Sequence, residues 1–158
     1  MPPTPFMQST FNTIGSHLAI ITGCHGYNMT YAHRLGSFPW AMVDALMLLE
    51  EGEAQDVLVV AADELTPTLD DILTRMGERR RGVTPSEGAT AFVLSSRRCS
   101  SPLMTIGSWE LSQECEASPL SDEAYPTAVA ERLAAAVGER REGLFKMGNL
   151  TLDLRCGG

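Results

Sequence analysis

Four side chains between positions 24 and 37 are of the types that carry acyl groups or move protons. Cys24 and Ser37 are potential nucleophiles, and His25 and His33 are potential general bases near them. A cysteine or serine that is activated by a histidine can attack a carbonyl carbon and hold the acyl group covalently. These residue types therefore indicate acyl-transfer chemistry, if the fold brings a nucleophile and a base together.

The pattern around these residues predicts a scaffold for such a site. The chain from Met29 to Gly52 has the pattern of a strand, a tight turn, a helix and a glycine stop. Many acyl-transfer enzymes place their nucleophile in a sharp turn between a strand and a helix, because the turn exposes the side chain and the helix N-terminus favours negative charge. Here the turn offers Leu35 and Gly36, so the scaffold is predicted without its nucleophile.

Each candidate nucleophile also has a structural interpretation. Serine is a preferred N-cap, and Ser37 stands at the entrance of the predicted helix. Cys24 follows a predicted helix in a glycine turn, where a cysteine can serve as a small packed residue. A reactive thiol would need a lowered pKa, which a sequence does not reveal.

Bulk properties exclude several classes of function. The chain has 158 residues, a net charge of −8 and 44% hydrophobic residues, which fits one globular domain and argues against nucleic-acid binding. Its four cysteines lack CxxC spacing, so no zinc site is predicted, and no phosphate loop or other cofactor motif is found. With no apolar run long enough to span a bilayer and no signal region after Met1, a cytoplasmic protein is expected.

The order of the predicted elements defines the fold class. We predict an α/β core in the order helix, strand, helix, strand, strand, over residues 10–22, 28–34, 38–51, 56–62 and 88–95, with a further helix over 66–76. The helix over 38–51 is apolar nearly all round, and the strand over 56–62 is continuously apolar. Both are therefore expected to be buried on all sides of a layered α/β domain.

Residues 99–158 carry weaker patterns. A strand is expected over 103–111 and an amphipathic helix over 122–137, whereas 144–154 is ambiguous and compatible with one more strand. We expect this part to be a C-terminal extension of the domain formed by residues 1–98, and a shortened version of a longer two-part protein is one interpretation.

An ordered set of motifs resembles a known family. The motifs are Gly15-Ser-His-Leu-Ala-Ile20, Gly23-Cys-His-Gly26, Asp56-Val-Leu-Val-Val-Ala-Ala-Asp-Glu64 and Ser86-Glu-Gly-Ala-Thr-Ala-Phe-Val-Leu94. Together they resemble the N-terminal half of a β-ketoacyl synthase of the thiolase-like superfamily. Among relatives, the chain looks most like the divergent synthase-like proteins of aryl-polyene and flexirubin-type pigment pathways. The resemblance implies a layered thiolase-like half-fold, with a mixed sheet and a buried helix, and structural backbone bonds for the acidic pair at 63–64.

Departures from that family determine the predicted function. Ungapped placement puts Leu35 where the family has its catalytic cysteine, and leucine cannot form a thioester. The family's catalytic histidines and helper lysine lie in a second half that this sequence does not contain. We therefore expect a non-catalytic, chain-length-factor-like subunit of fatty-acid or polyketide-type acyl chain synthesis, although the family as a whole consists of acyltransferases.

The resemblance also implies partners and a binding surface. The expected partner is a second copy or an active ketosynthase, with an acyl carrier protein as a further candidate. Dimerisation would use the predicted strand over 28–34, with Asn28, Thr30, Tyr31 and Arg34 at the interface. Phe38 and Trp40 would line an acyl tunnel, unless they are ordinary core residues.

Two alternatives stay open. One is an active 3-oxoacyl-carrier-protein synthase-type enzyme that uses Ser37 or Cys24 as nucleophile, with His33 as base or with histidines from a partner. The other is a structural remnant without an acyl role.

Overall fold

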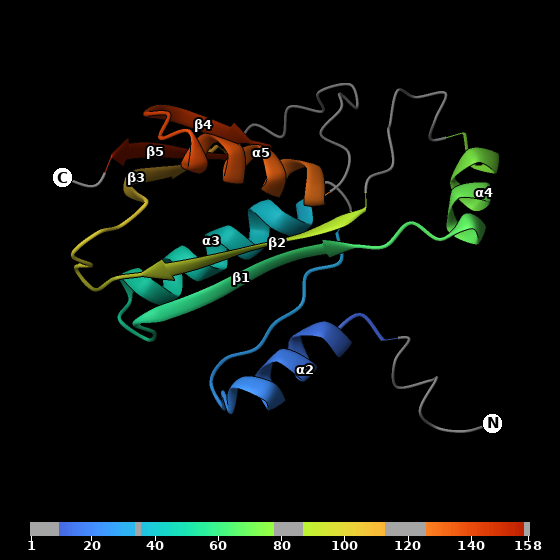
Figure 1. Ribbon diagram of the computed structural model, residues 1–158, viewed down its shortest axis with the longest axis horizontal. Helices are drawn as coiled ribbons and strands as arrows, with labels where there is room; N and C mark the ends of the chain where they lie inside the picture. Colours follow the sequence, from blue (N-terminus) through green and yellow to red (C-terminus); the bar gives the residue numbers. More distant parts are fainter. Residues whose placement is uncertain (1–9, 34–35, 78–86, 113–125, 157–158) are drawn as a thin grey trace. The chain divides into compact units, whose positions relative to one another are not determined.

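The computed structural model describes residues 10–33, 36–77, 87–112 and 126–156 of the chain. It divides into two compact units, Met1–His33 and Arg34–Gly158, which are described separately (Figure 1).

The first unit contains helix α2 (Thr13–Thr22), which confirms the helix predicted there. Gly23 ends the helix, and the backbone N–H of Cys24 donates to the carbonyl of Ala19 at 2.9 Å. Downstream, the Asn28 side chain donates to the carbonyl of Gly15 at 3.1 Å. A Cβ on Gly15 would lie 2.8 Å from Asn28 Oδ1, so a larger residue here would displace the Asn28 side chain.

The strand predicted over 28–34 is wrong for its described part. Residues 28–33 contain no regular secondary structure. A strand is stabilised by pairing with a neighbour, and within this unit the side chain of Asn28 binds helix α2 instead.

The second unit begins with two helices and two strands that alternate along the chain. They are α3 (Ser37–Glu50), β1 (Asp56–Asp63), α4 (Pro67–Arg75) and β2 (Gly88–Ser95). Strands β1 and β2 pair antiparallel without a register shift, from Asp56 opposite Ser95 to Asp63 opposite Gly88. The predictions for this stretch are confirmed to within a residue or two at each end.

The rest of the second unit forms a smaller layer of one helix and three strands. The elements are β3 (Met104–Leu111), α5 (Pro126–Gly138), β4 (Gly143–Met147) and β5 (Leu150–Cys156), and the strands pair antiparallel in the order β3-β5-β4. The α/β class is thus confirmed. Among the described residues the strands form two antiparallel sheets (Figure 1), where a mixed sheet was expected.

A two-residue turn explains why the segment 144–154 was ambiguous. Gly148 and Asn149 connect two strands, and Gly148 has a φ of 58°, the left-handed region that glycine adopts without strain. The segment is a hairpin rather than one strand.

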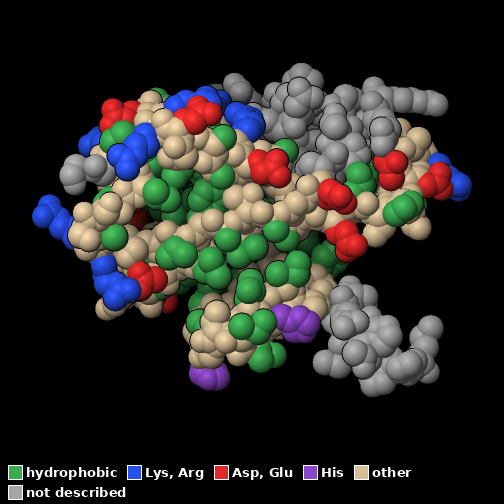
Figure 2. All heavy atoms as spheres, viewed as in Figure 1, with side chains coloured by type: hydrophobic (Ala, Val, Ile, Leu, Met, Phe, Trp, Pro, Cys, Tyr) green, Lys and Arg blue, Asp and Glu red, His purple; other side chains and the backbone are tan. Residues whose placement is uncertain are grey.

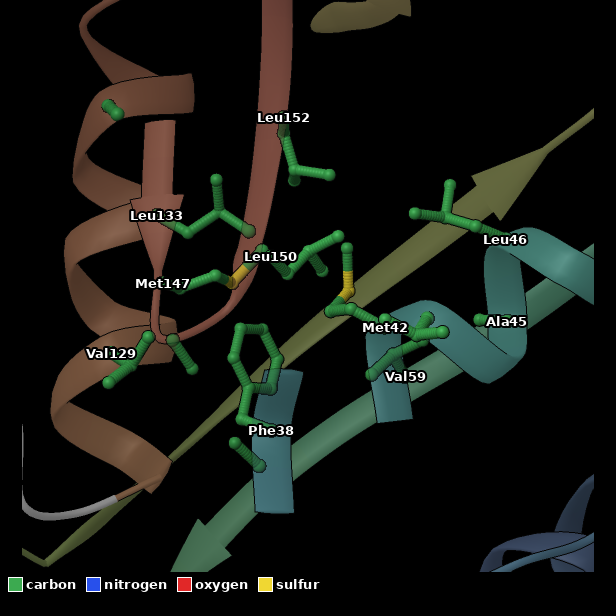
Figure 3. Close-up of a cluster of buried hydrophobic side chains, with 14 of the residues drawn as sticks. Phe38, Met42, Ala45, Leu46, Val59, Val129, Leu133, Met147, Leu150 and Leu152 are labelled. Carbon is green, nitrogen blue, oxygen red and sulfur yellow. The ribbon is translucent and has the colours of Figure 1, made fainter. Parts of the chain in front are cut away.

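One hydrophobic core joins all of these layers. Helices α3 and α5 both pack against β1 and β2. Side chains from the two helices, from β1 and from the β4–β5 hairpin converge between them (Figure 3). The most completely buried large side chains are Phe38, Met42, Leu133, Met147, Leu150 and Leu152.

Two elements are less buried than expected. Trp40 and Met47 are 42% and 44% exposed, so one stripe of α3 is open although the rest of the helix is packed. Leu58 is 48% exposed, because the face of β1 that points away from the core lacks a full cover. The prediction of burial on all sides is wrong for both elements, since the helices of this unit line only one face of the β1–β2 sheet.

No helix among the described residues is long and apolar enough to cross a membrane.

Candidate functional site

The start of helix α3 is the place where the sequence predicts an acyl-transfer site. Gly36 is the N-cap of α3 and Ser37 is its first helical residue, so the expectation of Ser37 as N-cap is wrong by one position. Arg34 and Leu35, for which interface and nucleophile-equivalent positions were predicted, lie outside the described residues.

The side chains at this helix start are enclosed. Ser37 is 8% exposed and Phe38 is 2% exposed. The Phe38 ring lies 5.7 Å from the ring of Phe92, centroid to centroid, at an interplanar angle of 42°. Such a tilted contact is a stabilising aromatic arrangement in a core. Ser37 is therefore the first residue of a helix whose first turn packs against β2.

The two predicted tunnel residues differ in their surroundings. Phe38 points into the core toward Met147 and Val129 (Figure 3). Trp40 is 42% exposed and shares the open stripe of α3 with Met47. Of this pair, only Trp40 presents apolar surface that a ligand or a partner could contact.

The other candidate residues belong to the first unit. Cys24 is a free, exposed cysteine, so the interpretation of it as a packed residue is wrong. His25 and His33 are exposed as well. Asn28 and Thr30 are exposed, and Tyr31 is half-buried. His33 belongs to the first unit and Ser37 to the second, so the proposed nucleophile–base pair stays a prediction.

A structural link between β1 and α5, whose partner residue sequence reasoning did not identify, lies at the end of β1. The carboxylate of Asp63 accepts hydrogen bonds from the backbone N–H of Thr127 at 3.3 Å and from its hydroxyl at 3.1 Å. Thr127 is fully buried in the first turn of α5. An acidic group at a helix N-terminus satisfies a free N–H and interacts favourably with the helix dipole.

Glu87 makes a similar connection on the neighbouring strand end. Its carboxylate accepts the backbone N–H of Leu65 at 3.3 Å. The carboxylates of Asp63 and Glu87 therefore both bind backbone groups, and for Asp63 this agrees with the structural role that the resemblance implied. No signal in the sequence connects Asp63 with Thr127, because the two are 64 positions apart.

Among the residues that the structure describes, no group of three or more histidine, cysteine, aspartate and glutamate side chains could hold a metal ion.

The α/β arrangement of the second unit is consistent with the half-fold that the motifs implied, and a comparison with protein families agrees. The family described as β-ketoacyl synthase, N-terminal domain, matches residues 1–147. The chain therefore belongs to the β-ketoacyl synthase N-terminal domain family. Comparisons with curated proteins and with solved structures give no match.

Proposed function

We propose that this chain is a non-catalytic, chain-length-factor-like ketosynthase subunit in fatty-acid or polyketide-type acyl chain synthesis. The observation that carries the proposal is Leu35, which ungapped placement of the motifs puts at the position of the family's catalytic cysteine. Covalent condensation requires a nucleophilic atom that accepts the acyl group, and an isobutyl side chain has none.

Burial at the start of α3 supports the absence of catalysis. Ser37 is the nearest hydroxyl to Leu35 in the sequence, and it is 8% exposed. An acyl thioester could reach this oxygen only if the packed first turn opened. The adjacent Phe38 is anchored against Phe92, which opposes such an opening.

The open stripe of α3 supports a role in shaping an acyl tunnel. A subunit that limits chain length needs apolar surface at the contact with its partner. Trp40 supplies a large, half-exposed indole, and Met47 extends the same stripe two turns further along the helix. In this proposal Phe38 supports Trp40 from the core side of the helix.

The proposed partner contact uses the segment 28–33 together with Arg34. A ketosynthase partner or a second copy would contact this segment, which has no regular secondary structure in the single chain. An acyl carrier protein is proposed as a second partner, because the growing acyl chain in such pathways is delivered as a thioester.

The test is an extender assay with radiolabelled malonyl thioester on three proteins: wild type, Leu35→Cys and Ser37→Ala. We expect no condensation product from any of them. A parallel reaction with an alkylating acyl analogue should label position 35 only in Leu35→Cys, since the α3 dipole favours a thiolate there. Product from wild type that disappears in Ser37→Ala would overturn the proposal and identify serine as the nucleophile.

One observation favours a second candidate function. Cys24 is free and exposed, which a thiol needs in order to carry an acyl group. Incubation with an acyl-carrier-protein thioester, followed by mass spectrometry, tests this alternative. Cys99 is also free and exposed, and it is the matched control. An adduct confined to Cys24 would favour an active acyltransferase, whereas no adduct or equal modification of both thiols would not.

A further inference from the structure

A groove lies in the second unit between the C-terminal half of α5 and strand β4. Its volume is about 370 Å³, within the range of about 300–1,000 Å³ that is usual for small-molecule sites. All of its lining residues lie between Arg132 and Leu154, so the groove is formed entirely within the second unit. Ala135 and Ala136 leave room beside the strand, because their side chains end at Cβ.

The floor of the groove is apolar. It contains the buried side chains of Ala136 and Leu154 and the half-buried ring of Phe145. Leu144, which is 78% exposed, extends this surface at the rim. The guanidinium carbon of Arg132 lies 5.7 Å from the centroid of the Phe145 ring, in a cation–π contact. An apolar ligand segment could therefore displace water from this floor.

Two arginines, Arg132 and Arg141, place positive charge at the rim of the groove. Arg141 pairs with Glu139 through Nε and Nη2, both of which contact the same carboxylate oxygen. Among the described residues these contacts leave the two N–H groups of Nη1 for a ligand. The Arg141 side chain is 64% exposed. A carboxylate is the planar acceptor that a guanidinium binds well.

The turn that carries Arg141 is held from both sides. Arg140 has a φ of 51°, in the left-handed region that favours glycine, and the N–H of Arg141 donates to the carbonyl of Ala136 at 2.9 Å. From β5, the thiol of Cys156 donates to the carbonyl of Arg140 at 3.6 Å, and the N–H of Cys156 donates to Glu142 at 2.8 Å. A cationic group that is already positioned loses little freedom when it binds a ligand.

Two acids beside the groove limit the charge of its ligand. Glu139 pairs with Arg141, and Glu142 lines the groove. Figure 2 shows basic and acidic side chains gathered together over α5 and β4. A ligand with one negative charge can bind Nη1 of Arg141, whereas a dianion such as a phosphate monoester meets stronger repulsion from both acids.

We propose that this groove binds a small amphipathic carboxylate, a molecule with one carboxylate head and an apolar tail. The head accepts hydrogen bonds from Nη1 of Arg141, and Arg132 adds positive charge. The tail covers the apolar floor at Phe145 and Leu154 and displaces water. None of the lining residues belongs to the open stripe of α3, so this site is independent of the proposed acyl tunnel.

The first experiment titrates the full-length protein with octanoate and follows the amide NMR spectrum. Saturable shifts are expected for the amides of residues 141–145. Arg141→Gln should weaken binding at least about tenfold, because a charge-assisted hydrogen bond is lost. Arg155→Gln is the matched control, since Arg155 is also 64% exposed and pairs with an acid two positions earlier, Asp153. No saturable shifts, or equal weakening by the two changes, would overturn the proposal.

The second experiment varies the ligand. Octan-1-ol lacks the charge and acetate lacks the tail, so each should bind wild type at least about tenfold more weakly than octanoate. Octyl phosphate should bind no more tightly than octanoate, because Glu139 and Glu142 repel its second charge. Octan-1-ol or acetate that binds as tightly as octanoate would overturn an amphipathic carboxylate as the ligand. Tighter binding of octyl phosphate would overturn the preference for a single charge.

A further variant fills the groove. Ala135→Leu replaces a methyl group by an isobutyl group at an exposed helix position, where leucine is a good helix former. Circular dichroism confirms that the variant folds, and octanoate should bind it at least about tenfold more weakly than wild type. Unchanged binding would overturn the proposal. Octanoate that shifts the α3 amides around Trp40 instead of residues 141–145 would assign the ligand to the α3 stripe and also overturn it.

Discussion

Asp63 is a single carboxylate that holds two distant elements together. It accepts both the backbone N–H and the hydroxyl of Thr127, a residue with no exposed surface. Removal of such an acceptor loses two hydrogen bonds and the favourable interaction of a carboxylate with the N-terminus of α5. Asp63 therefore stabilises the fold, whether or not the protein is an enzyme.

We predict that Asp63→Ala lowers the free energy of unfolding by about 1–2 kcal/mol, the usual cost of losing a helix cap. Glu64→Gln is the control, because Glu64 is the next residue and is exposed. Urea unfolding followed by circular dichroism measures both. Equal stability of Asp63→Ala and wild type would show that the carboxylate does not cap α5.

Leu152 tests whether the C-terminal hairpin belongs to the main core. Its side chain is fully buried, so Leu152→Ala should leave a cavity and cost about 2–5 kcal/mol of unfolding free energy. Leu144→Ala is the control, with a change within about 0.5 kcal/mol, because Leu144 is 78% exposed in the same hairpin. Similar losses for both variants in urea unfolding would contradict the shared core.

The elements that could be predicted are those whose own residues carry a clear sequence pattern. Helix α3 and strand β2 appear within a residue of their predicted bounds, because a glycine precedes α3, a glycine begins β2, and their patterns are strongly apolar. The segment 28–33 failed, since strand formation depends on a partner strand that no local pattern reports. The Gly148-Asn149 pair between two apolar runs is a recognised hairpin signal and could have separated β4 from β5.

The candidate site was predictable in its residues and not in its accessibility. Burial of Ser37 results from packing of α3 against β2 and α5, which are distant in the sequence. The same reason explains why Trp40 and Phe38, two residues apart, have opposite surroundings. Periodicity showed that the helix is apolar, but only the number of covering layers decides which stripe stays open.

The end of β5 is tied to the turn before β4 by a contact that depends on pH. The Glu142 carboxylate accepts the backbone N–H of Cys156 at 2.8 Å, and this bond lowers the pKa of Glu142 below its ordinary value of 4.5. A depressed pKa in the folded state means that the stabilisation is present above the unfolded pKa. It is lost as the pH falls through the folded pKa.

We therefore predict that wild type melts at a higher temperature than Glu142→Gln near neutral pH. The difference should shrink as the pH falls below about 4.5 and through the lowered folded-state pKa of Glu142, because the carboxylate is then protonated in the folded state as well as in the unfolded state. Glu53→Gln, a change at another exposed glutamate, is the control. A difference in melting temperature that stays constant over this range would show that the contact does not depend on ionisation.

For the second unit as a whole, one core joins residues that are far apart in the chain. Phe38 and Met42 contribute from its beginning, and Met147, Leu150 and Leu152 contribute from its end. Such a core is expected to unfold in one cooperative transition. Trp109, whose indole N–H donates to Glu50 at 2.6 Å, adds a further link between α3 and β3.

We predict that a chain ending at Gly138 does not form this core. Loss of β4 and β5 removes three fully buried side chains and uncovers one side of α3. The shortened chain should bind a hydrophobic dye and exchange its amide protons rapidly, whereas the full chain should do neither. Slow amide exchange in α3 of the shortened chain would contradict the prediction.

The position of the hairpin at the end of the core affects how the protein is made. During synthesis, α3 leaves the ribosome long before Leu150 and Leu152 are added, at a rate of about 5–20 residues per second. The apolar side chains of α3 therefore stay exposed for several seconds, until the β4–β5 hairpin has been synthesised and packs on them. Nascent chains with such exposed apolar surface recruit chaperones or aggregate. Yield in a cell should accordingly respond to translation speed between residues 51 and 150, where slower codons would prolong this exposure.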